Sequence, residues 1–130
     1  MSDGVLIVGG GLAAQRCCET LRARGFAGKV RIVGEEPRSP YDRPPLSKAV
    51  LAGERDADEL SFRPADWYAK NDVELILGDR AVALDTDLKT VTLESSAILT
   101  YDTAVIATGS RPRPLPGTES FANAHLLRTA

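Results

Sequence analysis

The chain has 130 residues, of which 43% are hydrophobic and 26% are charged, the size and balance of one soluble globular domain. Its formal net charge of -2 argues against a nucleic-acid-binding protein, which would normally carry a clear basic excess. The longest apolar stretch, Gly4–Ala14, is too short to cross a membrane. Cys17 and Cys18 are adjacent and form no disulfide framework, so we expect a cytoplasmic protein.

The first third of the chain predicts a strand, a helix and a second strand. Val5–Val8 is wholly apolar, as in a strand buried on both faces of a parallel sheet, and Val30–Val33 is similar. Between them, apolar residues recur at helical spacing, and Gly25 is expected to end the helix in the left-handed conformation. Gln15 and the charged residues fall mostly off this stripe. The stripe consists of Ala14, Cys17, Cys18 and Leu21. Together these elements predict a βαβ unit with parallel strands.

The middle of the chain predicts less regular structure. Pro37–Pro45 is too rich in proline for a regular element, and a short helix is expected around Leu46–Leu51. Asp56–Arg63 is charged and is expected to be a solvated loop. Asp66–Lys70 predicts a second short helix, capped by its first residue and anchored on the sheet by its two aromatic residues.

From Val73 onwards the hydrophobic pattern has a period of two, which is typical of strands. Four short runs separated by turn residues predict a small antiparallel β-meander. These runs are Val73–Leu77, Ala81–Leu84, Thr90–Leu93 and Ala97–Leu99. Thr103–Ala107 predicts a last buried strand before a proline-rich exit. The predicted fold class is therefore α/β, a Rossmann-like βαβ parallel sheet with a small antiparallel meander.

A glycine-rich turn between the first strand and the helix is the strongest functional signal. In the motif Gly9-x-Gly11-x-x-Ala14, the first glycine permits a tight turn, the second leaves room for a pyrophosphate, and the alanine allows close helix–strand packing. Glu35, at the end of the second strand, is placed to accept hydrogen bonds from a ribose diol. The alternative is a structural turn beside a surface glutamate. The motif predicts a bound adenine dinucleotide without choosing between NAD and FAD.

Two segments outside this turn resemble a known family. Tyr41–Lys48, with the sequence Tyr-Asp-Arg-Pro-Pro-Leu-Ser-Lys, and Ala107–Arg113 are similar to flavoprotein reductases that pass electrons from NADH to ferredoxins or rubredoxins, within the glutathione-reductase-like superfamily. The resemblance runs from Val5 to Arg128. Apoptosis-inducing-factor-like proteins and nitrite reductase subunits share parts of these motifs. Disulfide reductases carry a redox cysteine pair after the second strand, and this chain has no cysteine there.

The resemblance implies which residues hold FAD. The glycine turn would contact the pyrophosphate, the glutamate would hold the ribose, and a backbone group of the meander would meet the adenine. The implied cofactor-binding residues are Gly9, Gly10, Gly11, Leu12, Ala13, Glu35, Arg43, Lys48, Val82, Thr108, Gly109 and Arg128. From the residues alone, Arg43 could be an ordinary loop cation and Lys48 a solvated lysine. We expect no catalytic side chain in this chain and no metal site, because two adjacent cysteines and the distant His125 cannot surround a metal.

The resemblance also implies that residues 1–130 are the first segment of an FAD-binding domain, without the NADH-binding and C-terminal domains of longer family members. NADH would then act through a missing domain, and the electron acceptor would be a ferredoxin-type iron–sulfur protein of an oxygenase system. We expect the chain alone to be inactive and to bind FAD weakly or not at all. The alternative is a free-standing adenine-nucleotide-binding module without catalysis. The Arg-Pro-Pro-Leu-Ser-Lys segment disfavours a simple NAD dehydrogenase domain.

Overall fold

A computed structural model describes residues 2–130 of the chain. These residues form two α-helices, two short 3-10 helices (η1 and η2) and seven strands. In chain order the elements are β1 (Val5–Val8), α1 (Leu12–Ala23), β2 (Val30–Gly34), η1 (Pro44–Ser47), η2 (Ala57–Leu60), α2 (Ala65–Lys70), β3 (Val73–Leu77), β4 (Ala81–Asp85), β5 (Thr90–Leu93), β6 (Ile98–Thr100) and β7 (Thr103–Ile106). None of the helices within residues 2–130 is long and apolar enough to cross a membrane.

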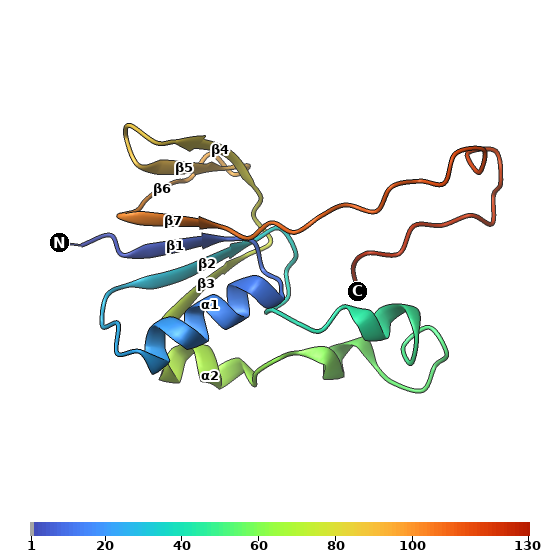
Figure 1. Cartoon of the computed structure of the whole chain (residues 1–130), viewed down its shortest axis with the longest axis horizontal. Coiled ribbons are helices and arrows are strands. Elements are labelled where there is room, and N and C mark those ends of the chain that lie inside the picture. The colour runs from blue at the N-terminus through green and yellow to red at the C-terminus, as the bar shows by residue number, and fades with distance from the viewer. Residues whose placement is uncertain (1) are drawn as a thin grey trace.

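Four parallel strands form the central sheet, in the order β3-β2-β1-β7. β1 lies inside this sheet, where Val5 is paired with Val30 of β2 on one side and with Thr103 of β7 on the other. Figure 1 shows α1 and α2 on one side of the sheet and the antiparallel strands β4, β5 and β6 on the other. The α/β class and the βαβ unit are therefore confirmed.

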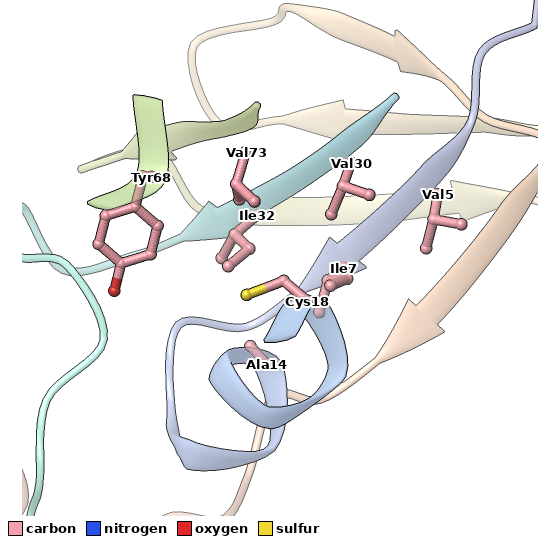
Figure 2. Close-up of a cluster of buried hydrophobic side chains, with 8 residues drawn as sticks. All are labelled: Val5, Ile7, Ala14, Cys18, Val30, Ile32, Tyr68 and Val73. Carbon is pink, nitrogen blue, oxygen red and sulfur yellow. The ribbon is translucent and has the colours of Figure 1, made fainter. Parts of the chain in front are cut away.

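β1 is buried on both faces, as its uninterrupted apolar sequence predicts. Val5 and Ile7 belong to the cluster between the sheet and the helices, which Figure 2 shows in close-up. Leu6 and Val8 belong to a second cluster, which includes buried residues of β5. Because successive side chains of a strand point to opposite faces, this one short strand contributes to both hydrophobic layers.

β3 was expected to belong to the antiparallel meander, and this prediction was wrong. It pairs in parallel with β2, with Val30 opposite Val73 and Gly34 opposite Leu77. A parallel pair needs a long crossover connection, and the segment between β2 and β3 supplies one that includes α2. The meander therefore consists of β4, β5 and β6 alone.

β7 was expected to be a buried strand, but it lies at the edge of the parallel sheet. Its pairing partner is β1, and no strand among residues 2–130 covers its other edge. Thr103 is exposed, and Ile106 keeps 59% of its surface accessible. An apolar run indicates that the faces of a strand are buried, but it does not show whether both edges of the strand are paired. It therefore does not distinguish a central strand from an edge strand.

The segment between β2 and α2 is more ordered than predicted. The helix expected around Leu46–Leu51 is replaced by η1 followed by turns. Asp56–Arg63, expected to be a solvated loop, contains η2, and its Leu60 is only 2% exposed. Leu46 and Leu60 pack with Tyr41 in a small third cluster. The charged residues around Leu60 concealed this contact at the sequence level.

The predicted C-terminal end of α1 is confirmed, but the predicted N-terminal cap of α2 is not. Gly25 has the expected positive φ of 80°, and the N–H groups of Gly25 and Phe26 donate to carbonyl groups in the last turn of α1, which is a Schellman ending. The predicted cap of α2 was wrong. Pro64 holds the cap position, whereas Asp66 lies in the first turn and pairs with Lys70 at 2.5 Å.

Gln15 was expected off the buried stripe of α1, but its side chain is fully buried. The hydroxyl of Tyr68, in α2, donates a hydrogen bond of 2.7 Å to Gln15 Oε1. Burial raises the pKa of Tyr68 to about 12, so the hydroxyl remains a donor over the whole working range of pH. Trp67 meets Tyr68 edge to face at 5.2 Å. The predicted anchoring role of these two aromatic residues is confirmed.

Glu19, in α1, accepts three hydrogen bonds, one of them from Arg63 just before α2. Its carboxylate accepts from Gln15 at 2.9 Å, from Arg16 at 2.6 Å and from Arg63 at 2.7 Å. The guanidinium of Arg63 also lies over the ring of Trp67. Burial alone would raise the pKa of Glu19, but these hydrogen bonds outweigh it and lower the pKa to about 2. The ionised form of Glu19 therefore stabilises the contact between α1 and Arg63, in the segment that leads into α2.

We expect Glu19→Gln to lower the free energy of unfolding at pH 7 by about 2 kcal/mol, the usual worth of hydrogen bonds to a buried charge. Because the folded pKa is about 2 and the ordinary value is 4.5, the stabilisation is complete above pH 4.5 and is lost as the pH falls towards 2. Urea unfolding of both proteins between pH 3 and pH 7 measures this difference.

The matched control is Glu74→Gln, which removes an exposed carboxylate 3.6 Å from Lys29. It should cost under about 0.5 kcal/mol. A difference between the native chain and Glu19→Gln that stays constant down to pH 3 and below would contradict the assigned role of Glu19.

Candidate functional site

The turn after β1 requires glycine at its first position. Gly9 has a φ of 121°, and a Cβ atom there would lie 2.1 Å from the carbonyl oxygen of Ala107, at the exit of β7. The N–H of Gly9 donates to the carbonyl oxygen of Val33 at 2.8 Å. Gly9 therefore turns the chain while the carboxyl ends of β1, β2 and β7 remain in contact.

The amino end of α1 has the features of an anion-binding site. Gly11 is the cap residue, with an ordinary φ of -101°, and a Cβ built on it would meet no atom within 4 Å apart from its immediate surroundings in the chain. No side chain among the described residues caps this end, and its first turn has no acidic residue. Leu12 and Ala13, in that turn, are exposed. Unpaired N–H groups and the helix dipole together favour a phosphate at such an end.

Two successive glutamates follow β2 and have different surroundings. Glu35 is exposed, and its carboxylate has no hydrogen-bond or ion-pair partner among residues 2–130. Glu36 is half-buried and forms an ion pair with Arg43 at 2.5 Å. The glutamate that the sequence singled out is therefore free to bind a ligand, and its neighbour is used within the protein.

A pocket of about 930 Å³ opens where β1, β2 and β7 end. This is the edge at which open parallel sheets bind their ligands, and the volume is in the range of small-molecule sites. Seven of the twelve predicted cofactor-binding residues line it. They are Gly9, Gly10, Glu35, Arg43, Thr108, Gly109 and Arg128.

The other five predicted residues lie outside this lining. Three of them, Gly11, Leu12 and Ala13, begin α1 directly after the lining residue Gly10. Val82 is exposed in β4, next to the lining residue Ala81. The pairing of β4 with β5 has an irregularity at this point, so that Val82 has no partner residue in β5. Such a bulge leaves backbone groups available outside the ladder.

Lys48 is the last of the predicted residues outside the pocket lining. It is exposed at the end of η1 and does not line the cavity. Its side chain has no hydrogen-bond partner among the described residues. The two charged residues of the Arg-Pro-Pro-Leu-Ser-Lys motif therefore lie in different surroundings. Arg43 lines the pocket, and Lys48 is exposed to solvent.

The segment after β7 forms another part of the wall. Gly109 has a φ of 71°, and a Cβ there would lie 2.9 Å from Arg128 Nη2. Arg128 Nε donates to the carbonyl oxygen of Ser110 at 2.8 Å. Thr108 and Gly109 thus lie beside Arg128, although Arg128 is far along the chain. The positive φ favours glycine at position 109, whereas the end of the flexible Arg128 side chain could move aside for a Cβ atom.

The sequence analysis missed several residues at or beside the pocket, of which three bear on its chemistry. Glu36 and Arg80 line the cavity, and Tyr41 contacts lining residues through its hydroxyl. A half-buried carboxylate next to an exposed one has no signature in the sequence. Tyr41 stands in the Tyr-Asp-Arg-Pro-Pro motif, so its position in that motif was the available signal.

The cysteines and the histidine take no part in this site. Burial raises the pKa of Cys18 to about 11 and also raises the pKa of Cys17, which makes both thiols unreactive. Cys18 packs in the cluster of Figure 2, and the structural interpretation of this pair is confirmed. His125 is exposed. Among residues 2–130, no group of three histidine, cysteine, aspartate or glutamate side chains could hold a metal ion.

Comparison with known proteins identifies relatives of this chain. The profile of the pyridine nucleotide-disulphide oxidoreductase family matches residues 3–130. The chain is 44% identical to putidaredoxin reductase of Pseudomonas putida, over 88% of this chain and 27% of that protein. It is 39% identical to rhodocoxin reductase of Rhodococcus erythropolis, over 97% of this chain and 30% of that protein. The chain therefore spans less than a third of the relatives that it matches.

A solved structure shares the same fold. The crystal structure of the covalent putidaredoxin reductase–putidaredoxin complex superposes with a TM-score of 0.83 at 44% identity. The superposition covers 90% of this chain and 28% of that one. The likeness in fold thus extends over most of this chain.

We expect Gly9→Ala to destabilise the chain by about 3 kcal/mol, because the new Cβ would clash with the carbonyl of Ala107 at an unfavourable φ. Gly11→Ala is the matched control in the same turn. Its φ is ordinary and its Cβ would meet open space, so it should cost under about 1 kcal/mol. Urea unfolding followed by circular dichroism compares the two, and equal stability of both variants would refute the assigned packing role of Gly9.

Proposed function

The chain belongs to the pyridine nucleotide-disulphide oxidoreductase family, and we propose that it is the first segment of the FAD-binding domain of an NADH-dependent reductase. In this proposal the whole protein passes electrons from NADH, through FAD, to a ferredoxin-type iron–sulfur protein of an oxygenase system. The observation that carries the proposal is the pairing of an open glycine turn with an unpartnered carboxylate, Glu35, at the same sheet edge.

The residues present fit the adenosine and pyrophosphate half of FAD. The uncapped end of α1, with open space at Gly11, suits a pyrophosphate. Glu35 is exposed and free to accept hydrogen bonds from the ribose diol. The backbone of Val82, at the bulge of β4, is our candidate for the adenine contact. Arg43 and Arg128 bring positive charge to a pocket that would receive two phosphates.

Bound FAD would supply the redox chemistry, since a flavin accepts a hydride and releases electrons one at a time. The chain's own residues bind and orient it. Thr108 and Gly109 turn the chain along one wall of the pocket. Lys48 is our candidate for the ammonium that stabilises negative charge on the reduced cofactor, and it would have to turn from solvent towards the flavin.

The names of the relatives support the choice of redox partner. One relative is the ferredoxin–NAD(+) reductase subunit of a benzene 1,2-dioxygenase system, 40% identical over 92% of this chain and 29% of that protein. A ferredoxin-type acceptor and NADH are therefore the partners that we propose for the whole protein. We also place it in the cytoplasm, where the free thiols of Cys17 and Cys18 would remain reduced.

The test of this function is made on the whole protein that contains residues 1–130. We expect it to purify with one FAD per chain, measured by flavin absorbance after denaturation, and to reduce a ferredoxin with NADH. A colourless protein that binds no flavin would overturn the proposal. Tight binding of FAD by the 130-residue chain on its own would instead favour a free-standing adenine-nucleotide-binding module.

We expect Glu35→Ala to weaken the binding of ADP to the chain by about tenfold, the effect of losing a hydrogen-bonded carboxylate worth about 1.4 kcal/mol. Isothermal titration calorimetry with ADP measures the adenosine and pyrophosphate half of the site directly. Glu54→Ala is the control, because Glu54 is an exposed glutamate that does not line the pocket. Equal affinities of both variants would remove Glu35 from the ribose contact.

A further inference from the structure

Glu36, Tyr41 and Arg43 form a hydrogen-bonded cluster beside the pocket, here called the Glu36 cluster. Tyr41 donates its hydroxyl hydrogen to Glu36 Oε2 at 2.6 Å, and Arg43 Nη2 donates to Glu36 Oε1 at 2.5 Å. Arg43 Nη1 donates to the hydroxyl oxygen of Tyr41 at 3.1 Å. Both oxygens of the carboxylate are therefore engaged, and one glutamate orients a tyrosine and an arginine together.

The Glu36 cluster holds the far end of the chain. Arg43 Nη1 donates to the carbonyl oxygen of Arg128 at 3.0 Å, and the N–H of Ala130 donates to the Tyr41 hydroxyl at 3.0 Å. After β7 the chain forms no further helix or strand. Figure 1 shows this segment leaving the sheet and returning so that its end lies near η1. Two hydrogen bonds thus fix the return of a long irregular segment.

The hydroxyl of Tyr41 has no free capacity left. A phenol offers one donor hydrogen and two acceptor positions, and these are used by Glu36, Arg43 and Ala130. Burial raises the pKa of Tyr41, which keeps the donor hydrogen in place. The ring is buried against Leu46, so the hydroxyl is carried by a rigid part of the fold.

The segment that the cluster holds is also a wall of the pocket. Arg128, Thr129 and Ala130 all line it. We propose that Glu36 is a positioning residue, which orients Tyr41 and Arg43 so that they fasten residues 128–130 as a wall of the nucleotide pocket before the nucleotide enters. The part of this inference that concerns nucleotide affinity rests on the proposed function, and the part that concerns the chain segment does not.

The burial of the ion pair makes the carboxylate of Glu36 important. The side chains of Glu36 and Arg43 are each only 23% exposed, so their interaction is screened less than that of a surface pair. In Glu36→Gln, one carboxylate oxygen is replaced by an NH2 group, which donates and cannot accept. The half-buried guanidinium of Arg43 then loses its counter-ion, and Tyr41 and Arg43 are left with one acceptor oxygen between them. Arg43 would then be free to leave the carbonyl of Arg128, and the wall would loosen.

Hydrogen–deuterium exchange of the nucleotide-free chain tests this inference. We expect Glu36→Gln to accelerate exchange about tenfold in peptides that cover residues 107–130, with β1 and β2 unchanged. Glu35→Gln is the matched control. It removes the same charge one residue earlier, from a side chain without a partner, and should leave the exchange of residues 107–130 as it is. A general loss of stability would accelerate exchange in β1 and β2 as well, and that outcome would overturn a positioning role.

Tyr41→Phe is a second variant for the same exchange experiment, in case Glu36→Gln fails to fold. It preserves the buried ring and the ion pair but removes the acceptor of the Ala130 N–H. We expect faster exchange of residues 107–130 in this variant too. Unchanged exchange in whichever of the two variants folds would overturn the proposal, whether or not any nucleotide binds.

Calorimetry with ADP on the same variants separates this inference from the proposed function. We expect Glu36→Gln to bind ADP about tenfold more weakly together with its loosened segment, and Glu35→Gln to bind weakly with the segment intact. A loosened segment with unchanged ADP affinity would overturn the role of the wall in binding. If the whole protein binds no flavin, the proposed function fails, and the exchange experiment alone decides whether Glu36 fastens the segment.

Discussion

The close approach of Gly9 to Ala107 is the contact on which the site depends. β1 and β7 are neighbours in the sheet but far apart along the chain, and their exits meet at a point where no side chain fits. The N–H of Gly9 also bonds to Val33, and the N–H of Ala107 to Val8. Three strand ends are thereby held at one edge, and the pocket opens there because the chain must turn away from all three.

The two glutamates after β2 are adjacent in the sequence but differ in exposure and in hydrogen bonding. Glu35 is exposed to solvent and available to a ligand, whereas the carboxylate of Glu36 accepts hydrogen bonds from Tyr41 and Arg43. The energetic reason is burial, since a half-buried carboxylate without donors would be costly. A carboxylate therefore stays unpaired only where water can still solvate it.

Much of the fold followed from hydrophobic pattern and turn chemistry. The apolar run of β1, the stripe of α1 and the left-handed Gly25 were all as expected. The failures have a common cause. The pairing of β3, the edge position of β7 and the burial of Gln15 each depend on which element becomes the neighbour. The sequence of one segment does not indicate which element will lie next to it when either possible neighbour would bury the same kind of side chain.

By itself the sequence determined the α/β class, the glycine turn and the candidate ribose carboxylate, because these depend on residues close together in the chain. Only the tertiary structure decided which of the predicted residues share a pocket. It separated Lys48 from Arg43 within one motif and brought Arg128 beside Gly109. It also assigned Glu36 to the fastening of residues 128–130. These are contacts between distant segments, and their formation depends on how the layers pack rather than on local propensity.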